Sequence, residues 1–222
     1  MKKINWLDHF ANLLVVILGI SIAFYLESYK EESNNLKQEV KYLESLISDM
    51  NADIKALDTL QVINEAMLQS LATLSRASVG QPYGGDSVLV NSTFRIQYNP
   101  PFSPQKTTYE SLKASGKMDL IGEFELRNKV VELYEQYYRG VADWDNAINE
   151  HVRDFVKPFY IHHVRFTGPG KLDPSFLSED AFRNMIFSYR SIFVSKNEFY
   201  SQVSQRISLV QEKLQARLEA LN

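Results

Sequence analysis

The residues best suited to chemistry in this chain of 222 residues are its histidines. His162 and His163 are neighbours, so on a regular helix or strand their rings point in different directions and do not readily bind one metal ion together. His151 and its neighbour Glu150 have the same geometry. No pair has the H-x-x-x-H or carboxylate-histidine spacing of a metal site, so we expect no metal and no other cofactor.

Motifs for nucleophilic and phosphate chemistry are also missing from the sequence. The chain has no cysteine, which excludes a thiolate nucleophile, a thiolate metal site and a disulfide. None of its serines lies in a G-x-S-x-G turn, and no glycine-rich loop has Walker or Rossmann spacing. The sequence therefore predicts a protein that is not an enzyme.

A group of aromatic residues in the C-terminal half is a third candidate for chemistry. Its members are Tyr134, Tyr137, Tyr138, Trp144, Phe155, Phe159 and Tyr160. They could line a pocket for a small molecule, but an aromatic stripe at helical spacing is more often core, with hydroxyl groups that reach the surface. We favour the core interpretation, and ligand binding is the alternative.

Composition indicates one folded domain, or one domain and an anchor. The apolar fraction of 45% and the charged fraction of 23% are ordinary for a globular protein. A formal net charge of −3 provides no basic field for a nucleic-acid backbone, so we expect no nucleic-acid partner.

The elements that must position these residues begin with an apolar run from Phe10 to Leu26, which contains no charged residue. As a helix this run spans roughly 25 Å, and the turn that contains Trp6 extends it to the ~30 Å of a bilayer core. Residues 1–29 are therefore predicted to be a transmembrane anchor. A buried core helix is the first alternative. A cleaved signal peptide is the second, but bulky residues at 24–26 stand where small ones are needed for cleavage.

The charges beside the run predict its orientation. Lys2 and Lys3 precede the run, whereas three glutamates and only one lysine, Lys30, follow it closely. By the positive-inside rule the N-terminus is cytoplasmic. We therefore expect a protein of the bacterial inner membrane with a periplasmic C-terminal domain.

Two pairs of residues in the anchor could contact a partner helix. Gly19 and Ala23 form a small-xxx-small pair, which permits close approach of helices in a bilayer. Asp8 and Asn12 lie one turn apart on one face, near the cytoplasmic interface. The alternative is that Asp8 lies among lipid headgroups and Gly19 has no role in packing.

Residues 30–80 are predicted to form a helical stalk and the first bundle helix, because no proline occurs before Pro82. Apolar residues recur at alternating spacings of four and three, which is a heptad pattern: Leu36, Val40, Leu43, Ile47, Met50, Ile54 and Leu57. Such a pattern favours parallel self-association of two copies. Packing of this helix against its own chain is the alternative, and we favour it.

Residues 81–106 are predicted to be an irregular loop rich in proline and glycine. A short run from Ser87 to Tyr98 has the composition of a β-strand. Phe94, Tyr98 and Phe102 favour a loop that drapes over one end of the bundle, and a partner-binding loop is the alternative.

Residues 107–222 are predicted to complete an antiparallel helical bundle. A threonine N-cap at residues 107–108 begins one helix, and Gly116 ends it. A long helix follows from about Glu123 and is disturbed at Pro158, and the last helix covers about 181–221. The predicted fold is thus all-α, with one N-terminal transmembrane helix that continues into a long helix.

Three stretches resemble a known group of proteins. They are LLVVILGISIAFYLESYKEE, which follows Trp6, LESLISDMNADI, and TYESLKASGKMDLIGEFELRNKVVELY. They look like segments of a bacterial family of uncharacterised membrane proteins, common in Bacteroidetes-type genomes. The chain departs from that family where Leu26-Glu27-Ser28-Tyr29 stands in place of a usual tryptophan. The resemblance implies a membrane-anchored helical protein and supplies no catalytic residue.

The function that these features favour is a non-enzymatic, membrane-anchored accessory or scaffolding protein. It would self-associate or join other membrane proteins in a larger assembly. The alternative is an extracytoplasmic helical-bundle sensor that binds a small ligand through its aromatic interior. A hydrolytic or metal-dependent enzyme that uses His162 and His163 comes third.

Overall fold

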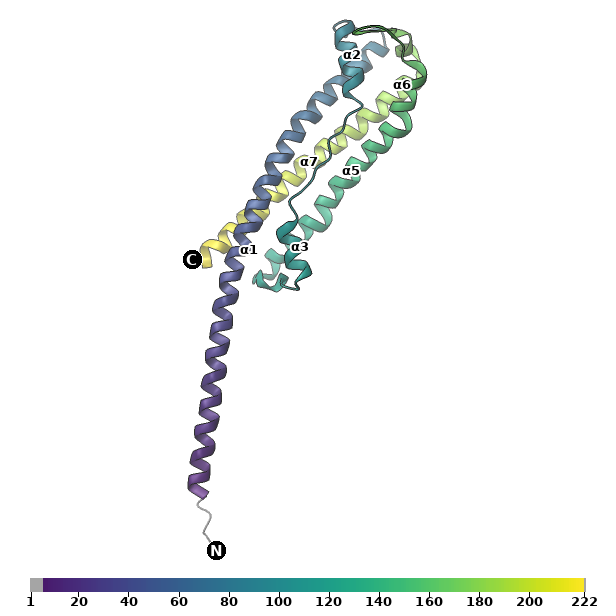
Figure 1. The fold of residues 1–222 in the computed structure, drawn as a ribbon. Helices are drawn as coiled ribbons and strands as arrows, with labels where there is room; N and C mark the ends of the chain where they lie inside the picture. The colour runs from purple at the N-terminus through teal and green to yellow at the C-terminus, as the bar shows by residue number, and fades with distance from the viewer. Residues whose placement is uncertain (1–5, 222) are drawn as a thin grey trace.

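The structure is a computed structural model that describes residues 6–221, without the side chains of residues 6–9 and 11. It confirms an all-α fold with one long N-terminal helix. Figure 1 shows this helix leaving a bundle that the rest of the chain forms. Asp8 lies outside the described side chains, so its predicted contact is not placed.

Helix α1 (Trp6–Ser78) is unbroken and has a length of roughly 110 Å. It ends where Gly80 adopts a φ of 73°, in the left-handed region that glycine favours. The N–H of Gln81 bonds to the Arg76 carbonyl, and that of Gly80 bonds to the Ala77 carbonyl. This pair of bonds is a Schellman motif, which satisfies carbonyls that the helix end leaves free.

The segment predicted as a β-like run is a helix, α2 (Asp86–Arg95). Asp86 places a carboxylate in the first turn, where it stabilises the helix dipole. Leu89, Val90 and Thr93 form a buried face at helical spacing. The strand prediction was wrong because packing of this face outweighs the β propensity of valine, threonine and phenylalanine.

Residues 98–106 form an extended segment without regular structure. Figure 1 shows it running along the bundle from α2 to α3, so it does not drape over one end as predicted. Phe102 is buried, but Phe94 and Tyr98 are 55% and 65% exposed. Of these three aromatic residues, only Phe102 therefore packs against the core as expected.

Helix α3 (Thr107–Ala114) begins at Thr107, but its N-cap is Lys106 and no side chain caps it. The predicted threonine cap is therefore wrong. Gly116 does end the helix, with a φ of 68°. A Schellman motif forms there as well, because the Lys117 N–H bonds to the Leu112 carbonyl. A short 3-10 helix, η1 (Met118–Leu120), follows.

The next five elements form one continuous helical rod. They are α4 (Phe124–Glu132), the π-helix η2 (Leu133–Tyr137), α5 (Tyr138–His151), the π-helix η3 (Val152–Val156) and α6 (Lys157–His163). The predicted disturbance at Pro158 is the second π-helix. The Lys157 N–H bonds to Val152, five residues back, directly before the proline that has no N–H to donate.

A small hairpin joins this rod to the last helix. Strands β1 (Phe166–Gly168) and β2 (Lys171–Leu172) pair antiparallel, and the 3-10 helix η4 (Pro174–Ser178) follows. Helix α7 (Asp180–Leu221) then returns along the bundle, with nearly the predicted bounds. In Figure 1, α1 and the α4–α6 rod run in one direction and α7 runs in the other.

The buried apolar residues form two separate cores. The core nearer the free part of α1 includes Leu57, Val141 and Val203. The core at the opposite end, which we call the distal end, includes Leu71, Ile148 and Phe182. The two cores share the same three long rods of the described chain, so they belong to one bundle.

The heptad residues contribute mainly to the nearer core. Leu43, Met50 and Leu57 are fully buried by the chain itself, and Ile47 and Ile54 pack against them. Val40 is half-buried, whereas Leu36 is 42% exposed. The structure thus supports the alternative in which this helix packs against its own chain, and it leaves few heptad side chains free for a second copy.

We predict that Leu43→Ala lowers the free energy of unfolding by about 2–5 kcal/mol, because it opens a cavity in the nearer core. Leu36→Ala should change it by less than about 0.5 kcal/mol. Urea unfolding of the full chain in mild detergent, followed by the fluorescence of half-buried Trp144, measures both. Equal losses in the two variants would instead support a coiled coil between copies.

Candidate functional site

A polar layer separates the two cores. At the level between the two cores, each long rod places a polar residue where the spacing of its neighbours predicts an apolar one: Asn64 on α1, Asp145 on α5 and Lys196 on α7. All three are buried, and their exposed fractions are 1%, 4% and 0%. Buried polar groups are costly unless they are paired, so this layer is the most distinctive site in the described part of the bundle.

The centre of the polar layer is an ion pair between Lys196 and Asp145. The Lys196 Nζ lies 2.8 Å from the Asp145 Oδ1. The Tyr200 hydroxyl donates to the same carboxylate at 3.0 Å, and the Lys196 ammonium lies over the Tyr200 ring. Burial lowers the pKa of Lys196, and the nearby Asp145 carboxylate opposes that shift. The pair has the partners that a buried charge requires.

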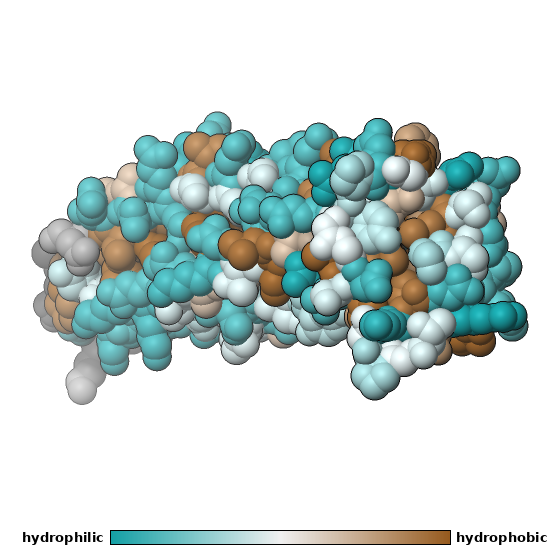
Figure 2. Space-filling model, turned by 90° about the horizontal axis from the view of Figure 1, so that it is seen from above, coloured by the Kyte–Doolittle hydropathy of each residue, from teal (hydrophilic) through white to brown (hydrophobic). Residues whose placement is uncertain are grey.

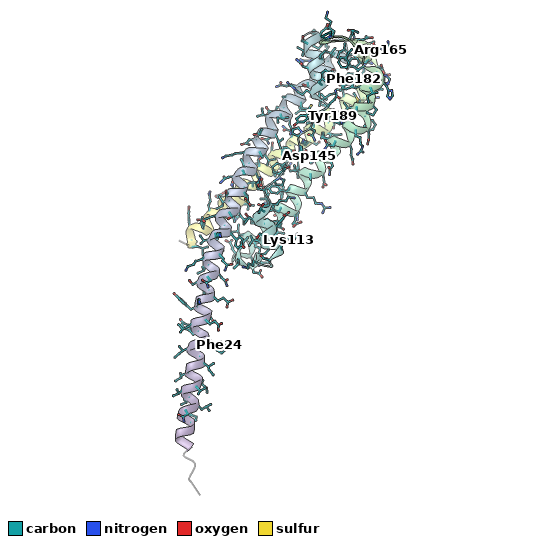
Figure 3. The ribbon with its side chains drawn as sticks, viewed as in Figure 1. Phe24, Lys113, Asp145, Arg165, Phe182 and Tyr189 are labelled. Atoms are coloured by element: carbon teal, nitrogen blue, oxygen red, sulfur yellow. The ribbon has the colours of Figure 1, made fainter. Side chains whose placement is uncertain are left out.

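The polar layer also holds the extended segment. The Phe102 N–H donates to the Asp145 Oδ2 at 2.9 Å, and the Lys196 Nζ donates to the Asn99 side chain at 2.6 Å. Nearer the distal end, the Tyr189 hydroxyl donates to the Ile96 carbonyl. Figure 3 shows Asp145 and Tyr189 among the side chains between the rods. Side chains of the rods thus supply bonds that this segment cannot obtain from a helix or sheet.

Asp53 on α1 holds the other end of the extended segment. Its Oδ1 accepts from the Gln105 N–H at 2.7 Å, and its Oδ2 accepts from the Tyr138 hydroxyl at 2.5 Å. Burial raises the pKa of Asp53, whereas these hydrogen bonds lower it. Burial also raises the pKa of Tyr138, so its hydroxyl remains a donor. The Tyr134 hydroxyl completes the set by donating to the Gln105 carbonyl.

A third buried acid, Glu39, links α1 to α7 near the free part of α1. Arg217 on α7 donates to both oxygens of Glu39 on α1, at 2.9 and 3.0 Å. The Gly122 N–H, which precedes α4, donates to the same carboxylate at 3.1 Å. Two-pronged arginine–carboxylate contacts are geometrically specific. This contact therefore fixes the base of all the long rods where α1 leaves the bundle.

These acids are arranged to hold backbone and side-chain donors. A general acid or base must reach the proton that it transfers, within hydrogen-bond distance or through one water molecule. Asp53, Asp145 and Glu39 are at most 4% exposed, and each accepts at least two hydrogen bonds from the chain. The geometry that is present fixes the fold of the bundle.

The histidines predicted as the main candidates for chemistry lie apart from this layer. His151 is buried, and burial lowers its pKa. Its neutral ring donates from Nε2 to the Met185 carbonyl and stacks on Tyr189. His162 is exposed, and the His163 Nδ1 lies 2.8 Å from Glu179. No cluster of three metal-ligating side chains occurs among the residues that the structure describes.

The aromatic group divides between core and surface. Tyr134, Tyr138, Phe159 and Tyr160 are buried, whereas Phe155 is 58% exposed. Most of the group thus packs as core, with Tyr109 stacked on Tyr134 at 4.3 Å between ring centroids.

The residues predicted to pack within the anchor lie on the free part of α1. A Cβ atom added at Gly19 would have no neighbour within 4 Å, and the side chains of Asn12 and Ala23 are exposed. Figure 3 shows Phe24 on this part of the helix, far from the bundle. The structure therefore brings none of these residues to the polar layer.

Comparison with protein families assigns the chain to a group. Residues 12–160 match the model of the Family of unknown function (DUF6090). The chain belongs to this family. No curated protein and no solved structure matches the chain. The DUF6090 match includes Asp53, Tyr138 and Asp145, and it ends before α7, which supplies Lys196 and Arg217.

The buried ion pair of this DUF6090 protein could have been predicted from the sequence, because both of its residues interrupt an apolar stripe. Lys196 lies between Phe193 and Tyr200, where apolar residues at spacings of three and four line one face of α7. Asp145 lies in the same way between Val141 and Ile148. A charge of each sign within an apolar stripe predicts that the two pair in a core.

We predict that Lys196→Met destabilises the protein by about 3–5 kcal/mol, because it leaves the Asp145 carboxylate buried without its cation. Asp145→Asn should also destabilise it. The double variant should be more stable than the sum of the single losses, with a coupling of about 1–3 kcal/mol. Urea unfolding of the full chain in mild detergent measures all three free energies.

The exposed pair of Lys113 and Glu135 is a matched control. The Lys113 Nζ lies 2.5 Å from the Glu135 Oε1, but the two side chains are 60% and 46% exposed. Lys113→Met should cost no more than about 1 kcal/mol. If the losses in free energy of unfolding for Lys196→Met and Asp145→Asn simply add in the double variant, the ion pair does not organise the layer.

Proposed function

We propose that this protein is a non-enzymatic accessory or scaffolding protein, anchored in a membrane by the free part of α1. One observation carries the proposal: the run from Phe10 to Leu26 is uncharged and lies wholly outside the bundle. Val15 is 68% exposed and Phe24 is 65% exposed. Neither core of the bundle uses these side chains.

The energetic argument for a membrane rests on this exposure. Burial of one valine, leucine, isoleucine or phenylalanine side chain is worth about 1.5–3 kcal/mol. Most residues of the run are of these types. A bilayer removes the whole run from water while the helix satisfies its own backbone hydrogen bonds. The run spans roughly 25 Å, and the preceding turn that contains Trp6 extends the helix to the ~30 Å hydrocarbon thickness.

The charges that flank the run favour a cytoplasmic N-terminus and a bundle on the opposite side of the bacterial inner membrane. Lys2 and Lys3 precede the run, and Glu27, Glu31 and Glu32 follow it. Because α1 continues without a break from the run into the bundle, the bundle is attached to the anchor by a stiff rod. Such a connection suits a protein that holds a partner at a fixed height above the bilayer.

Gly19 and Ala23 favour association of the anchor with another membrane helix. The open space beside Gly19 would admit a close backbone approach, which is the basis of small-xxx-small packing. The partner in this proposal is a second copy of the chain or another membrane protein. The burial of the heptad residues within the bundle makes the anchor, and not the stalk, the main surface for this contact.

We predict that Val16→Lys with Ile20→Lys releases the protein from membranes. Each charge near the middle of the span costs about 2.5–3.5 kcal/mol. Alkaline carbonate extraction should leave the wild type, and a Val16→Leu and Ile20→Leu control, in the membrane pellet. Extraction of the wild type itself would contradict the anchor.

Cysteine labelling of the same membranes tests on which side of the bilayer the bundle lies. The chain has no cysteine, so Lys213→Cys on an exposed face of α7 is a unique label site. A membrane-impermeant maleimide should label it from the periplasmic side in intact spheroplasts. Labelling only after lysis would place the bundle in the cytoplasm.

We predict that tagged full-length protein, purified from its native membranes in mild detergent, is recovered with a stoichiometric partner or a second copy. Gly19→Leu with Ala23→Leu should lower that recovery several-fold, because the larger side chains hold the helices apart. Ile17→Leu is the control, since it lies on the opposite face at roughly 100° per residue. Recovery of a single copy alone, as measured by light scattering, would contradict an assembly role.

A further inference from the structure

A cavity of about 480 Å³ lies at the distal end of the bundle, between α2, α6 and the β-hairpin. Its apolar walls include Phe94 on α2, Ile161 on α6 and Phe166 on β1. Figure 2 looks down on this end and shows apolar residues between polar ones, on the side where Figure 1 places α2 and α6. The volume is in the range of pockets that bind small organic molecules.

The walls favour a flat apolar group. The rings of Phe94 and Phe166 stack on each other at 5.5 Å between centroids, yet each is 55% exposed. Ile161 is 78% exposed. Exposed aromatic rings of this kind gain stabilisation from an aromatic partner beyond the burial of area alone. A ring in the cavity would therefore cover side chains that the bundle leaves in water.

The cavity has one charged lining residue, Lys157. Among the described residues, Lys157 forms no ion pair, and no acidic side chain lines the cavity. Arg165, which Figure 3 places at the distal end, precedes Phe166 in the chain, but its charge interacts with the Asp173 carboxylate. The one charge that lines the cavity is therefore the positive charge of Lys157, which would favour a carboxylate.

A neutral donor, the buried Tyr160 hydroxyl, lies beneath the same cavity. Among the described residues it makes no well-formed hydrogen bond. Its polar neighbour is the Thr93 hydroxyl, which donates to the Leu89 carbonyl at 2.8 Å and has only acceptor capacity left for Tyr160. Burial raises the pKa of Tyr160, so this hydroxyl keeps its proton. An unsatisfied buried donor is unfavourable, and an acceptor on a ligand would satisfy it after a small side-chain shift.

We propose that the cavity between α2, α6 and the β-hairpin is a binding site for a small aromatic carboxylate. The ring lies against Phe94 and Phe166, the carboxylate faces Lys157, and the Tyr160 hydroxyl donates to an oxygen of the ligand. This site goes beyond the proposed accessory function and does not depend on it. It shares Tyr160 with the aromatic group that the sequence offered as an alternative ligand site, but Tyr134 and Tyr138 of that group are packed in the nearer core.

The test uses full-length protein in lipid nanodiscs and 2-naphthoate, whose fluorescence anisotropy rises when it binds. Empty nanodiscs provide the background. We expect saturable binding of one probe per chain, and weaker binding of the uncharged analogue naphthalene-2-carboxamide. Lys157→Gln should weaken 2-naphthoate roughly five- to ten-fold and leave the carboxamide within about two-fold, because only the charged contact is lost.

Tyr160→Phe should weaken the carboxamide roughly three- to ten-fold, which is the size of one neutral hydrogen bond, and should weaken 2-naphthoate by at least about ten-fold, because its oxygens are charged. Without ligand its melting temperature should change little, since the hydroxyl makes no well-formed internal hydrogen bond that the substitution would remove. Phe187→Ala, on an exposed part of α7 away from the cavity, is the control and should bind like the wild type. No saturable binding, or unchanged affinity for 2-naphthoate in Lys157→Gln or Tyr160→Phe, would overturn the proposal.

Discussion

The extended segment at residues 98–106 runs along the bundle without a helix or a sheet to pair its backbone. Backbone donors that leave water must find partners, so side chains of the rods have to supply them. Asp145 and Asp53 do this at Phe102 and Gln105. Because Asp145 would otherwise be an unpaired buried charge, Lys196 must face it from α7. This chain of requirements determines which residues of α1, α5 and α7 lie at the same level of the bundle.

A polar layer between two apolar cores resists sliding of the rods. Apolar stripes at spacings of three and four could pack in several registers that differ by one or two turns. A shift of α7 by one turn would bury Lys196 among apolar side chains. It would also leave the buried Asp145 carboxylate opposite an uncharged side chain. Such buried polar pairs are best known for fixing register, at some expense in stability. The Glu39–Arg217 contact fixes the same register again at the base of the bundle.

The bundle and the free part of α1 belong to different solvents in the function that we propose. The bundle satisfies its apolar faces within the chain, whereas the run from Phe10 to Leu26 finds no cover there. A single unbroken helix joins the two, so the distal end is held far from the membrane-facing end. The apolar cavity at the distal end and the uncovered face at Gly19 are therefore separate contact surfaces on one rod.

The sequence by itself determined the elements, because helical periodicity, proline and glycine act locally. It predicted one unbroken helix from the apolar run to a point just before Pro82, the stop at Gly116 and nearly the bounds of α7. It misassigned residues 87–98, since the β propensity of that run is weaker than the packing of Leu89 and Val90 on the distal core. It left open whether Leu43, Met50 and Leu57 face a second copy or their own chain, because an apolar stripe can pack equally well against either. Only the tertiary structure decided that, and only it brought Asp145, Lys196 and Phe102 together, because their contacts join positions far apart in the chain.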